Sequence, residues 1–369
     1  MKKKKILVGL SGGVDSAITA YLLKQEGHDV TAGFMINYLA PKGEHCPTEE
    51  DIEVAKEVSK FLDIPFFTFD YRDEYEDKVL NYMYEGYKKG VTPNPDIMCN
   101  SEIKFKVFLD EALELWFDMV ATGHYARINP PVSQEFDIPL NKGEWAQRKG
   151  DFFALKKGVD NTKDQSYFLA GLDQSQLSKA LFPIGNMQKS EVRELAREIW
   201  LPNAERKDSQ WICFVGKVRL DKFLEKKIPA KPGNIVDTSG KILWTHKWIY
   251  YYTVGQRKGL DVGGMPEPIF VVRKDLEKNE LIVGYESDAG LYGKELIVSQ
   301  MHILGRDDFT FPLSAKVKIR YRQVDQEATI EKIAEWYKVV FLETQRAIAS
   351  GQIVTIYLED ELVMSWVIS

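Results

Sequence analysis

Residues 9–16 read Gly9-Leu10-Ser11-Gly12-Gly13-Val14-Asp15-Ser16, and this is the most informative stretch of the chain. An apolar run, residues 5–10, leads into it, and a helical pattern over residues 17–25 follows. Gly12 and Gly13 let the backbone approach a ligand closely, so that successive amides beside a helix N-terminus can bind an anion. The order of strand, glycine turn and helix predicts a phosphate-binding site; the alternative is a glycine turn of structural use only.

The turn differs from two common phosphate motifs. It lacks the lysine of GxxxxGK[ST], and it does not match GxGxxG, so neither γ-phosphoryl transfer nor dinucleotide binding is predicted. Residues 11–16, SGGVDS, instead resemble the PP-motif of the ATP pyrophosphatases. In that superfamily ATP is cut between its α and β phosphates, and AMP activates a carbonyl oxygen as a leaving group.

Length and composition limit the class of protein. A chain of 369 residues is too long for one core and fits two or three domains. With 49 Lys and Arg against 55 Asp and Glu, the net charge of −6 argues against indiscriminate nucleic-acid binding and leaves room for a local basic patch. Since no apolar run approaches the roughly 20 residues that span a bilayer, a cytoplasmic protein is expected. Cys46, Cys99 and Cys213 fit neither a disulfide framework nor paired zinc ligands, which favours free or catalytic thiols.

The first part of the chain alternates strands with helices. Extended runs are expected at residues 29–35, 66–69 and 119–122, and helices at about 48–62, 73–88 and 101–115. This alternation predicts an α/β fold with a doubly wound parallel sheet. Ligands of such sheets bind beyond the carboxyl ends of the strands, where Ser11, Met35, Gly123 and His124 are expected to converge.

The second part of the chain is rich in strands. After an excursion at residues 129–151 and helices at about 174–181 and 189–200, short strands are expected from Gly233 onward, among them 235–237, 241–244, 249–254, 269–272 and 281–283. They predict two small β domains, and we place the domains at residues 1–216, 217–286 and 287–369. A strand over residues 316–322 would put Lys316, Lys318, Arg320 and Arg322 on one face, either as a phosphate-backbone contact or as a solvated outer face.

Six stretches, SGGVDS among them, carry a resemblance to one family, the tRNA-specific 2-thiouridylases (MnmA/TrmU), which belong to the PP-motif superfamily. The residues that carry it are SGGVDS, Thr92-Pro-Asn-Pro-Asp-Ile-Met-Cys-Asn100, Thr122-Gly-His-Tyr-Ala-Arg127, Lys163-Asp-Gln-Ser-Tyr-Phe168, Lys207-Asp-Ser209 with Ile212-Cys-Phe214, and Gly255-Gln-Arg-Lys-Gly-Leu260. The resemblance implies a PP-motif ATP-pyrophosphatase domain, a small central domain that binds tRNA and a C-terminal β-barrel. It also implies an activity, ATP-dependent 2-thiolation of the wobble uridine (position 34) of tRNAs for Lys, Glu and Gln.

The resemblance also implies the site residues. Cys213 would carry a persulfide, Cys99 would resolve the adduct and leave a Cys99–Cys213 disulfide, and Asp96 would assist proton transfer or position the base. Because a thiolate is the competent form, we expect Cys99 to lie just before a helix that starts at Ser101. The nucleotide contacts would be Gly9, Leu10, Ser11, Gly12, Gly13, Val14, Asp15, Ser16, Met35 and Gly123. The tRNA contacts would be Asn94, Pro95, Asp96, His124, Lys163, Asp164, Gln165, Arg320, Tyr321 and Gln352; His124 is equally compatible with a packing role.

The partners implied are ATP with Mg²⁺, the tRNA, and a sulfur-carrier protein or cysteine desulfurase that supplies the persulfide sulfur, with the enzyme itself a monomer. The base would be flipped out of the anticodon loop. No residues are assigned as dedicated metal ligands.

The chain departs from the family at several glycines, where it has Trp116, Trp200, Trp211, Trp248 and Trp366. If those positions use φ > 0, each indole imposes strain, and Trp211 so close to Cys213 would impair catalysis. Two alternatives therefore stand beside the thiouridylase. One is another PP-motif ligase, which would need neither cysteine, and the other is a non-catalytic protein that binds tRNA and ATP.

Overall fold

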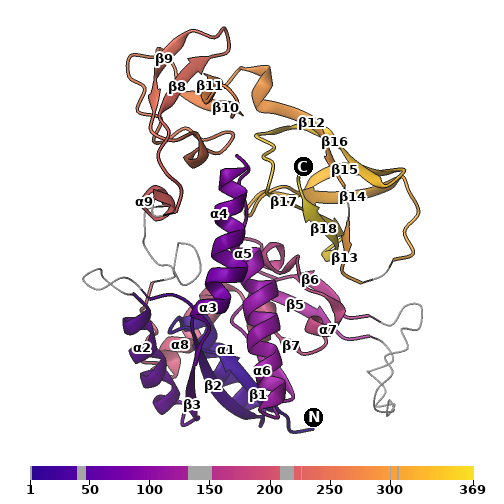
Figure 1. Cartoon of the computed structure of the whole chain (residues 1–369). Coiled ribbons are helices and arrows are strands. Elements are labelled where there is room, and N and C mark those ends of the chain that lie inside the picture. Colours follow the sequence, from indigo (N-terminus) through magenta and orange to yellow (C-terminus); the bar gives the residue numbers. More distant parts are fainter. Residues whose placement is uncertain are drawn as a thin grey trace.

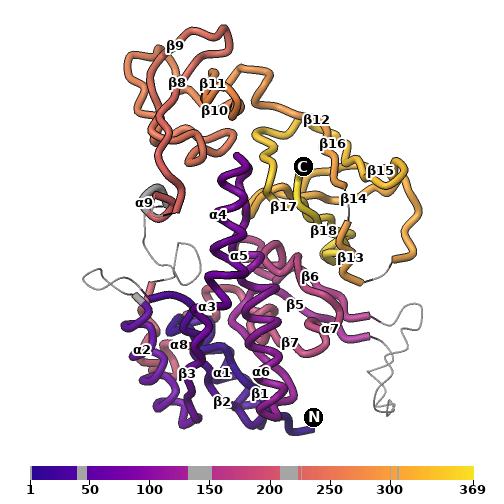
Figure 2. Tube along the Cα trace, in the orientation of Figure 1, coloured from indigo at the N-terminus to yellow at the C-terminus, as the bar shows by residue number. Residues whose placement is uncertain are grey.

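The structure is a computed structural model that describes residues 2–39, 47–131, 152–207, 220–225, 227–299, 301–305 and 307–369. Figure 1 shows three lobes, and Figure 2 traces the chain through them in the same orientation. The N-terminal α/β lobe lies at the bottom, the small lobe of β8–β11 at the top, and the C-terminal β lobe at the right. Helix α4, Asn81–Lys88, rises from the first lobe toward the second.

The N-terminal lobe is built on a parallel sheet with strand order β3-β2-β1-β4-β7. Every neighbouring pair in it is parallel, which confirms the predicted doubly wound α/β class. The central strand is apolar throughout Ile6, Leu7 and Val8 because helices cover both faces of the sheet. The strands are β1 Lys5–Gly9, β2 Asp29–Ile36, β3 Phe66–Asp70, β4 Met119–Ala121 and β7 Ala180–Leu181.

The side chains of β1 alternate between two hydrophobic clusters, one on each face. Ile6 and Val8 pack with α1, α2 and α8, whereas Leu7 packs with the helices of residues 72–88 and 95–114. The bounds of the first group are α1 Val14–Gln25, α2 Pro47–Phe61 and α8 Lys189–Glu198. The second group comprises two continuous helical runs, α3 Arg72–Tyr75, η1 Glu76–Leu80 and α4, then α5 Pro95–Met98, η2 Cys99–Val107 and α6 Phe108–Glu114.

Several of the predicted elements are wrong in extent or type. The helix expected at Ser101 begins at Pro95, because Asn94 caps it and proline is well suited to the first helical turn. The helix expected over 174–181 is α7, Gln174–Leu177, followed by strand β7. The strand expected over 249–254 instead contains a 3₁₀ turn, Ile249–Tyr251.

The two β lobes have separate sheets. The central one has strand order β10-β11-β8-β9, with β8 Gly233–Asp237, β9 Ile242–His246, β10 Ile269–Asp275 and β11 Glu280–Tyr285; α9, Leu220–Glu225, precedes it. The C-terminal sheet runs β12-β16-β15-β14-β17-β18-β6-β5, and β13 pairs with β18. Its C-terminal strands are β12 Tyr292–Val298, β13 His302–Ile303, β14 Leu313–Lys318, β15 Gln326–Ile333, β16 Trp336–Arg346, β17 Ile353–Leu358 and β18 Glu361–Val367.

The N-terminal part of the chain contributes two strands to that last sheet. β5, Ala126–Asn129, pairs with β6, Ala154–Lys157, and Lys156 of β6 pairs with Glu361 of β18. The excursion predicted between them falls largely outside the described residues. The C-terminal lobe is therefore joined to the first lobe by backbone pairing as well as by side chains.

The loops of both β lobes also contact the first lobe. The Thr92 backbone N–H donates to the carbonyl of Ser350 at 2.8 Å, and the side chain of Leu276 packs where a side chain on Gly90 would lie. Among the described residues, no helix is long and apolar enough to cross a membrane.

Candidate active site

The glycine turn between β1 and α1 has the backbone conformation that its sequence predicts. Gly12 has φ +77°, and Gly13 takes an extended conformation as the residue that caps α1. The Ser16 hydroxyl donates to the Gly13 carbonyl at 3.0 Å and accepts the Ser11 N–H at 3.1 Å, which ties the two ends of the turn together. Leu10 and Val14 have buried side chains, so they can offer a ligand only their backbone.

Three loops meet at the carboxyl edge of the sheet, beyond β1, β2 and β4. A side chain on Gly9 would lie 3.1 Å from Cε of Met35, and one on Gly123 would lie 2.6 Å from the Ser16 nitrogen. Gly123 therefore has to be glycine for β4 to approach the start of α1. The convergence of Met35 and Gly123 on the turn is what the parallel sheet predicts for a ligand site.

Asp15 of the turn is held by two residues that sequence reasoning did not single out. Its carboxylate accepts hydrogen bonds from the Tyr125 hydroxyl at 2.7 Å and from Nζ of Lys189 at 2.7 and 2.8 Å. The Lys189 side chain is 13% exposed and lies at the first position of α8. The predicted start of a helix at Lys189 was the one signal that could have found it.

Cys99 lies inside the helical run that starts at Pro95, one turn after its beginning. Its side chain is fully buried and is a free thiol. The expectation that Cys99 lies just ahead of a helix N-terminus is therefore wrong, because the Asn94 cap starts the helix earlier: its side-chain oxygen accepts the Ile97 N–H at 3.3 Å. A reaction at this thiol requires the surrounding core to open.

The residues expected at the target-base pocket lie under a loop of the C-terminal lobe. Asn94 also contacts the buried Tyr167, whose hydroxyl donates to the Ile353 carbonyl at 2.9 Å. Burial raises the pKa of Tyr167 above its ordinary value, so this hydroxyl stays protonated. Gln352 donates from Nε2 to the Thr92 carbonyl at 2.8 Å. The structure thus brings Asn94 and Gln352 to one place; Pro95 and Asp96 follow Asn94 on the first turn of α5, both half-buried.

The basic strand expected over 316–322 is shorter than predicted. β14 ends at Lys318, and Arg320 and Tyr321 lie in the turn that follows, where Arg322 has φ +63°. The four cations therefore do not share one strand face. The centroids of the Tyr321 and Phe168 rings lie 4.3 Å apart, and Nη1 of Arg320 donates to the carbonyl of Arg346 at 3.1 Å.

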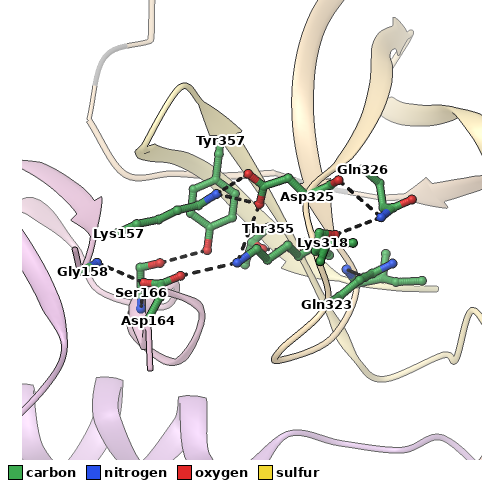
Figure 3. Close-up of polar contacts among 12 residues, drawn as sticks. Lys157, Gly158, Asp164, Ser166, Lys318, Gln323, Asp325, Gln326, Thr355 and Tyr357 are labelled. Atoms are coloured by element: carbon green, nitrogen blue, oxygen red, sulfur yellow. Dashed lines mark hydrogen bonds and ion pairs between the residues drawn. The ribbon is translucent and has the colours of Figure 1, made fainter. Parts of the chain in front are cut away.

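Lys318 is part of a buried ion-pair network between the first and third lobes (Figure 3). Its Nζ lies 3.4 Å from a carboxylate oxygen of Asp164 and 3.7 Å from Asp325, and Asp325 in turn accepts from Lys157 at 2.6 Å. Two lysines and two aspartates balance in charge, and Nζ of Lys157 and of Lys318 lie over the ring of Tyr357, 4.2 and 5.5 Å from its centroid. Burial lowers the pKa of Lys157, while Asp325 opposes that shift. Neither a phosphate contact nor a solvated face describes Lys318.

The loop at residues 163–165 is mixed in character. Asp164 is buried, and Oδ1 accepts the N–H groups of Gly158 and Ser166 at 3.2 and 3.0 Å, which is a structural role. Gln165 accepts the Tyr125 N–H at 3.0 Å and is half-buried, as is Lys163. Only Lys163 and Gln165 therefore keep side-chain surface that a ligand can reach.

His124 is a buried packing residue in this structure. Its ring packs against Phe105 and Phe182, and Nδ1 lies 2.7 Å from the Thr122 hydroxyl. Burial, together with the charge of Lys104, lowers the pKa of His124 well below its ordinary value. The packing alternative fits this neutral ring better than a contact with tRNA.

Cys213, Trp211 and Cys46 lie outside the described residues, so the Cys99–Cys213 pairing is not placed by the structure. Within the part of the chain that is described, no three His, Cys, Asp or Glu residues gather as a metal would require.

Two of the tryptophans at expected glycine positions do have φ > 0. Trp116 has φ 66° and Trp200 has φ 59°, and each side chain is 84% exposed. Trp248 is instead extended, with φ −158°, and buried against Tyr251. Trp366 lies in β18 and pairs with Val354. The predicted backbone strain is therefore confirmed at the ends of α6 and α8 and is absent at Trp248.

Comparisons with known proteins cover the whole chain. The family model described as tRNA methyl transferase HUP domain matches residues 4–217, a PRC-barrel domain model matches 221–285, and an aminomethyltransferase beta-barrel domain model matches 293–368. The tRNA-specific 2-thiouridylase MnmA of Christiangramia forsetii is 42% identical, over 99% of this chain and 100% of the relative. That of Shouchella clausii is 44% identical over 100% and 98%, and MnmA 1 of Geobacillus kaustophilus is 43% identical over 98% and 94%.

The parallel sheet, the SGGVDS turn at its carboxyl edge and the two β lobes that follow define the class: a HUP-domain protein with PRC-barrel and β-barrel domains. Identity above 40% along nearly the full length then settles the membership within that class. The chain belongs to the tRNA-specific 2-thiouridylase (MnmA) family.

Proposed function

We propose that this protein uses ATP to thiolate C2 of the wobble uridine, position 34, in tRNAs for Lys, Glu and Gln. The observation that carries the proposal is the junction at the carboxyl edge of the sheet, where the SGGVDS turn, Met35 and Gly123 meet in a chain that belongs to a 2-thiouridylase family over its whole length. A different PP-motif ligase is not favoured by that match, and neither is a non-catalytic relative.

The first step would be adenylation of the base. The uracil carbonyl oxygen attacks the α-phosphorus of ATP, pyrophosphate leaves, and the oxygen becomes part of a good leaving group. The turn amides of Gly12 and Gly13 would hold the phosphates, since they lie beside the N-terminus of α1. Mg²⁺ would arrive with ATP and screen its charge. Phosphate oxygens and water satisfy most of its coordination, which suits a site where the residues that the structure describes form no carboxylate cluster. Asp15 is the one carboxylate of residues 9–16, and it already accepts hydrogen bonds from Tyr125 and Lys189.

The second step would be sulfur transfer. The terminal sulfur of a Cys213 persulfide attacks C2, and AMP leaves. The Cys99 thiolate then attacks the Cys213 sulfur, which releases 2-thiouridine and leaves a Cys99–Cys213 disulfide that an external thiol must reduce. Asp96, at the first turn of the helix that carries Cys99, would position the base or move its proton. Because Cys99 is fully buried, binding of the flipped base would have to expose it.

The surface for tRNA would span two lobes. Asn94, Pro95, Asp96, Arg320, Tyr321 and Gln352 would surround the flipped nucleotide, and Lys163 and Gln165 would extend the contact. We assign the ATP site to residues 1–216, the central lobe to 217–286 and the barrel to 287–369, a division that the ranges of the three family models support. The sulfur would come from a carrier protein or a cysteine desulfurase, and we expect a monomer acting in the cytoplasm, where thiols stay reduced.

The test is a thiolation assay with ATP, Mg²⁺, unmodified tRNA for Lys or Glu and a persulfide donor, a cysteine desulfurase with free cysteine. Thiolated tRNA is read by retarded migration in a mercury-containing gel. A retarded band that disappears in Cys99→Ser and in Cys213→Ser is expected. Full thiolation by Cys99→Ser would refute the role of Cys99 as the resolving thiol. Release of pyrophosphate from ATP without any retarded band would favour another adenylating ligase, and tRNA binding with neither would favour a binding protein.

A further inference from the structure

The carbonyl oxygen of Gly12 is held by two side chains from a distant segment. Nδ2 of Asn203 donates to it at 2.8 Å and Nη1 of Arg206 at 3.2 Å. Both residues lie in the turn after α8, far from the glycine turn in sequence. Asn203 is 5% exposed. Gly12 must be glycine here because its φ is +77° and a Cβ on it would lie 2.9 Å from the backbone carbonyl oxygen of Asp51.

Fixing this oxygen also fixes the amide on the other side of the same peptide bond. In a trans peptide the C=O and the N–H point in opposite directions, so the N–H of Gly13 is directed away from Asn203 and Arg206. It faces the Ser11 hydroxyl, 3.5 Å away, on the exposed side of the turn. Because neither Gly12 nor Gly13 has a Cβ, side-chain sterics do not hold this peptide in one orientation, and its orientation depends on hydrogen bonds.

Arg206 is itself held from two helices. Nη2 forms an ion pair with Asp51 of α2, and Glu50 lies 3.6 Å from the same nitrogen. Arg193 of α8 donates to the carbonyls of Ala204 and Arg206 at 2.8 and 2.6 Å, which fixes the backbone of the turn. Burial is the main cause that raises the pKa of Asp51, and Arg206 opposes it. The donors to Gly12 are thus set in place before any ligand binds.

We propose that Asn203 and Arg206 are positioning residues of the nucleotide site, which hold the Gly12–Gly13 peptide with its N–H directed at the phosphates of ATP. The inference rests on the proposed function, because it takes ATP as the ligand of this turn. Neither side chain needs to touch ATP. Losing one of the two donors lets the peptide rotate, and the loss of one oriented amide corresponds to about a tenfold rise in the Kd for ATP.

The test measures ATP binding by titration calorimetry with Mg²⁺ present, on the full chain and on Asn203→Leu, Arg206→Met and Arg206→Lys. We expect about a tenfold rise in Kd for the first two and partial recovery in Arg206→Lys, which keeps a donor. The Kd for tRNA, from filter binding, should not change. A general loss of folding would instead weaken both ligands.

Arg197→Met is the matched control. Arg197 lies on α8 and pairs with Glu205 of the same turn at 2.7 Å, but neither residue bonds the glycine turn. Its Kd for ATP should equal that of the wild type. The proposal is overturned if Asn203→Leu binds ATP normally or if Arg197→Met loses as much. If Asn203→Leu folds poorly, the Arg206→Met and Arg206→Lys variants decide. Equal Kd values for ATP in Arg206→Met and the wild type would then overturn the proposal. A wild type that binds no ATP refutes the proposed function itself, and the inference with it.

Discussion

Trp116 and Trp200 each end a helix in a conformation that suits glycine, so replacing either with glycine is expected to stabilise the protein. Each donates its N–H to the carbonyl three residues earlier, and the following residue bonds the carbonyl five residues earlier. This is the Schellman arrangement. The same two bonds occur at Gly27 after α1 and at Gly90 after α4, where φ is 84° and 75°.

The magnitude follows from three terms. A residue with a Cβ in the left-handed region costs about 1–2 kcal/mol. Replacing tryptophan with glycine removes that cost. It also makes the unfolded chain more flexible, which lowers the free energy of unfolding by about 0.5–1 kcal/mol. The indoles are 84% exposed, so little buried surface is lost. The net gain is about 1 kcal/mol at each site, and the two should add because α6 and α8 pack in different hydrophobic clusters.

The assay is thermal unfolding of the N-terminal lobe within the full chain, where 1 kcal/mol corresponds to about 2–4 °C. Trp116→Ala is the control for strain, because alanine keeps the Cβ and should gain little. Leu115→Gly is the control for position: Leu115 is 53% exposed with φ −81°, and glycine there should cost about 1 kcal/mol. The reasoning is refuted if Trp116→Ala stabilises as much as Trp116→Gly, or if Trp116→Gly lowers the midpoint.

The positive φ of Trp116 and Trp200 leads to a prediction about the protein made in its own organism. We expect peptide mass mapping of protein isolated from its source cells to show glycine at residues 116 and 200, as it would if the codon translated as tryptophan is decoded there as glycine. Tryptophan at both positions would show that the organism tolerates the strain.

Three other perturbations test the site. Lys318→Met should lower the free energy of unfolding by about 3–5 kcal/mol in urea, because it leaves the 4%-exposed carboxylate of Asp164 without its cation. Adding Asp164→Asn should recover most of the loss. A double variant as unstable as the single one would contradict this. The imidazole of His124 should show no NMR titration near pH 6.5. Below about pH 6.5 the unfolded chain binds a proton at His124 that the folded protein does not. This residue therefore lowers the free energy of unfolding as the pH falls below about 6.5 and has no such effect above it. A normal titration curve would count against the buried, neutral ring. Gly123→Ala places a Cβ 2.6 Å from the Ser16 nitrogen and should weaken ATP binding about tenfold or more in calorimetry, whereas an unchanged Kd would mean that the loop yields freely.

Local signals in the sequence were enough for the architecture and for the nucleotide turn. The alternation of apolar strands with helices predicts the parallel sheet, because a strand covered on both faces has to be apolar throughout, as Ile6, Leu7 and Val8 are. The conformation of Gly12 and the strain at Trp116 were predictable too, since the presence or absence of a Cβ is a property of one residue.

An earlier helix start explains why the predicted position of Cys99, just before a helix, is wrong. Asn94 and Pro95 together form a strong helix start, and they place the cysteine inside the helix instead of before it. That signal was present in the sequence.

The partners of the charged and polar groups could be found only in the folded structure. Lys318 belongs to a regular basic pattern, yet it is paired with Asp164, 154 positions away, and the carbonyl of Gly12 is held by Asn203, 191 positions away. A pattern along one strand shows which face a side chain takes, but its partner across a lobe boundary depends on how the lobes pack. An ion pair or hydrogen bond acts over a few ångströms of space, and distance along the chain does not measure that separation.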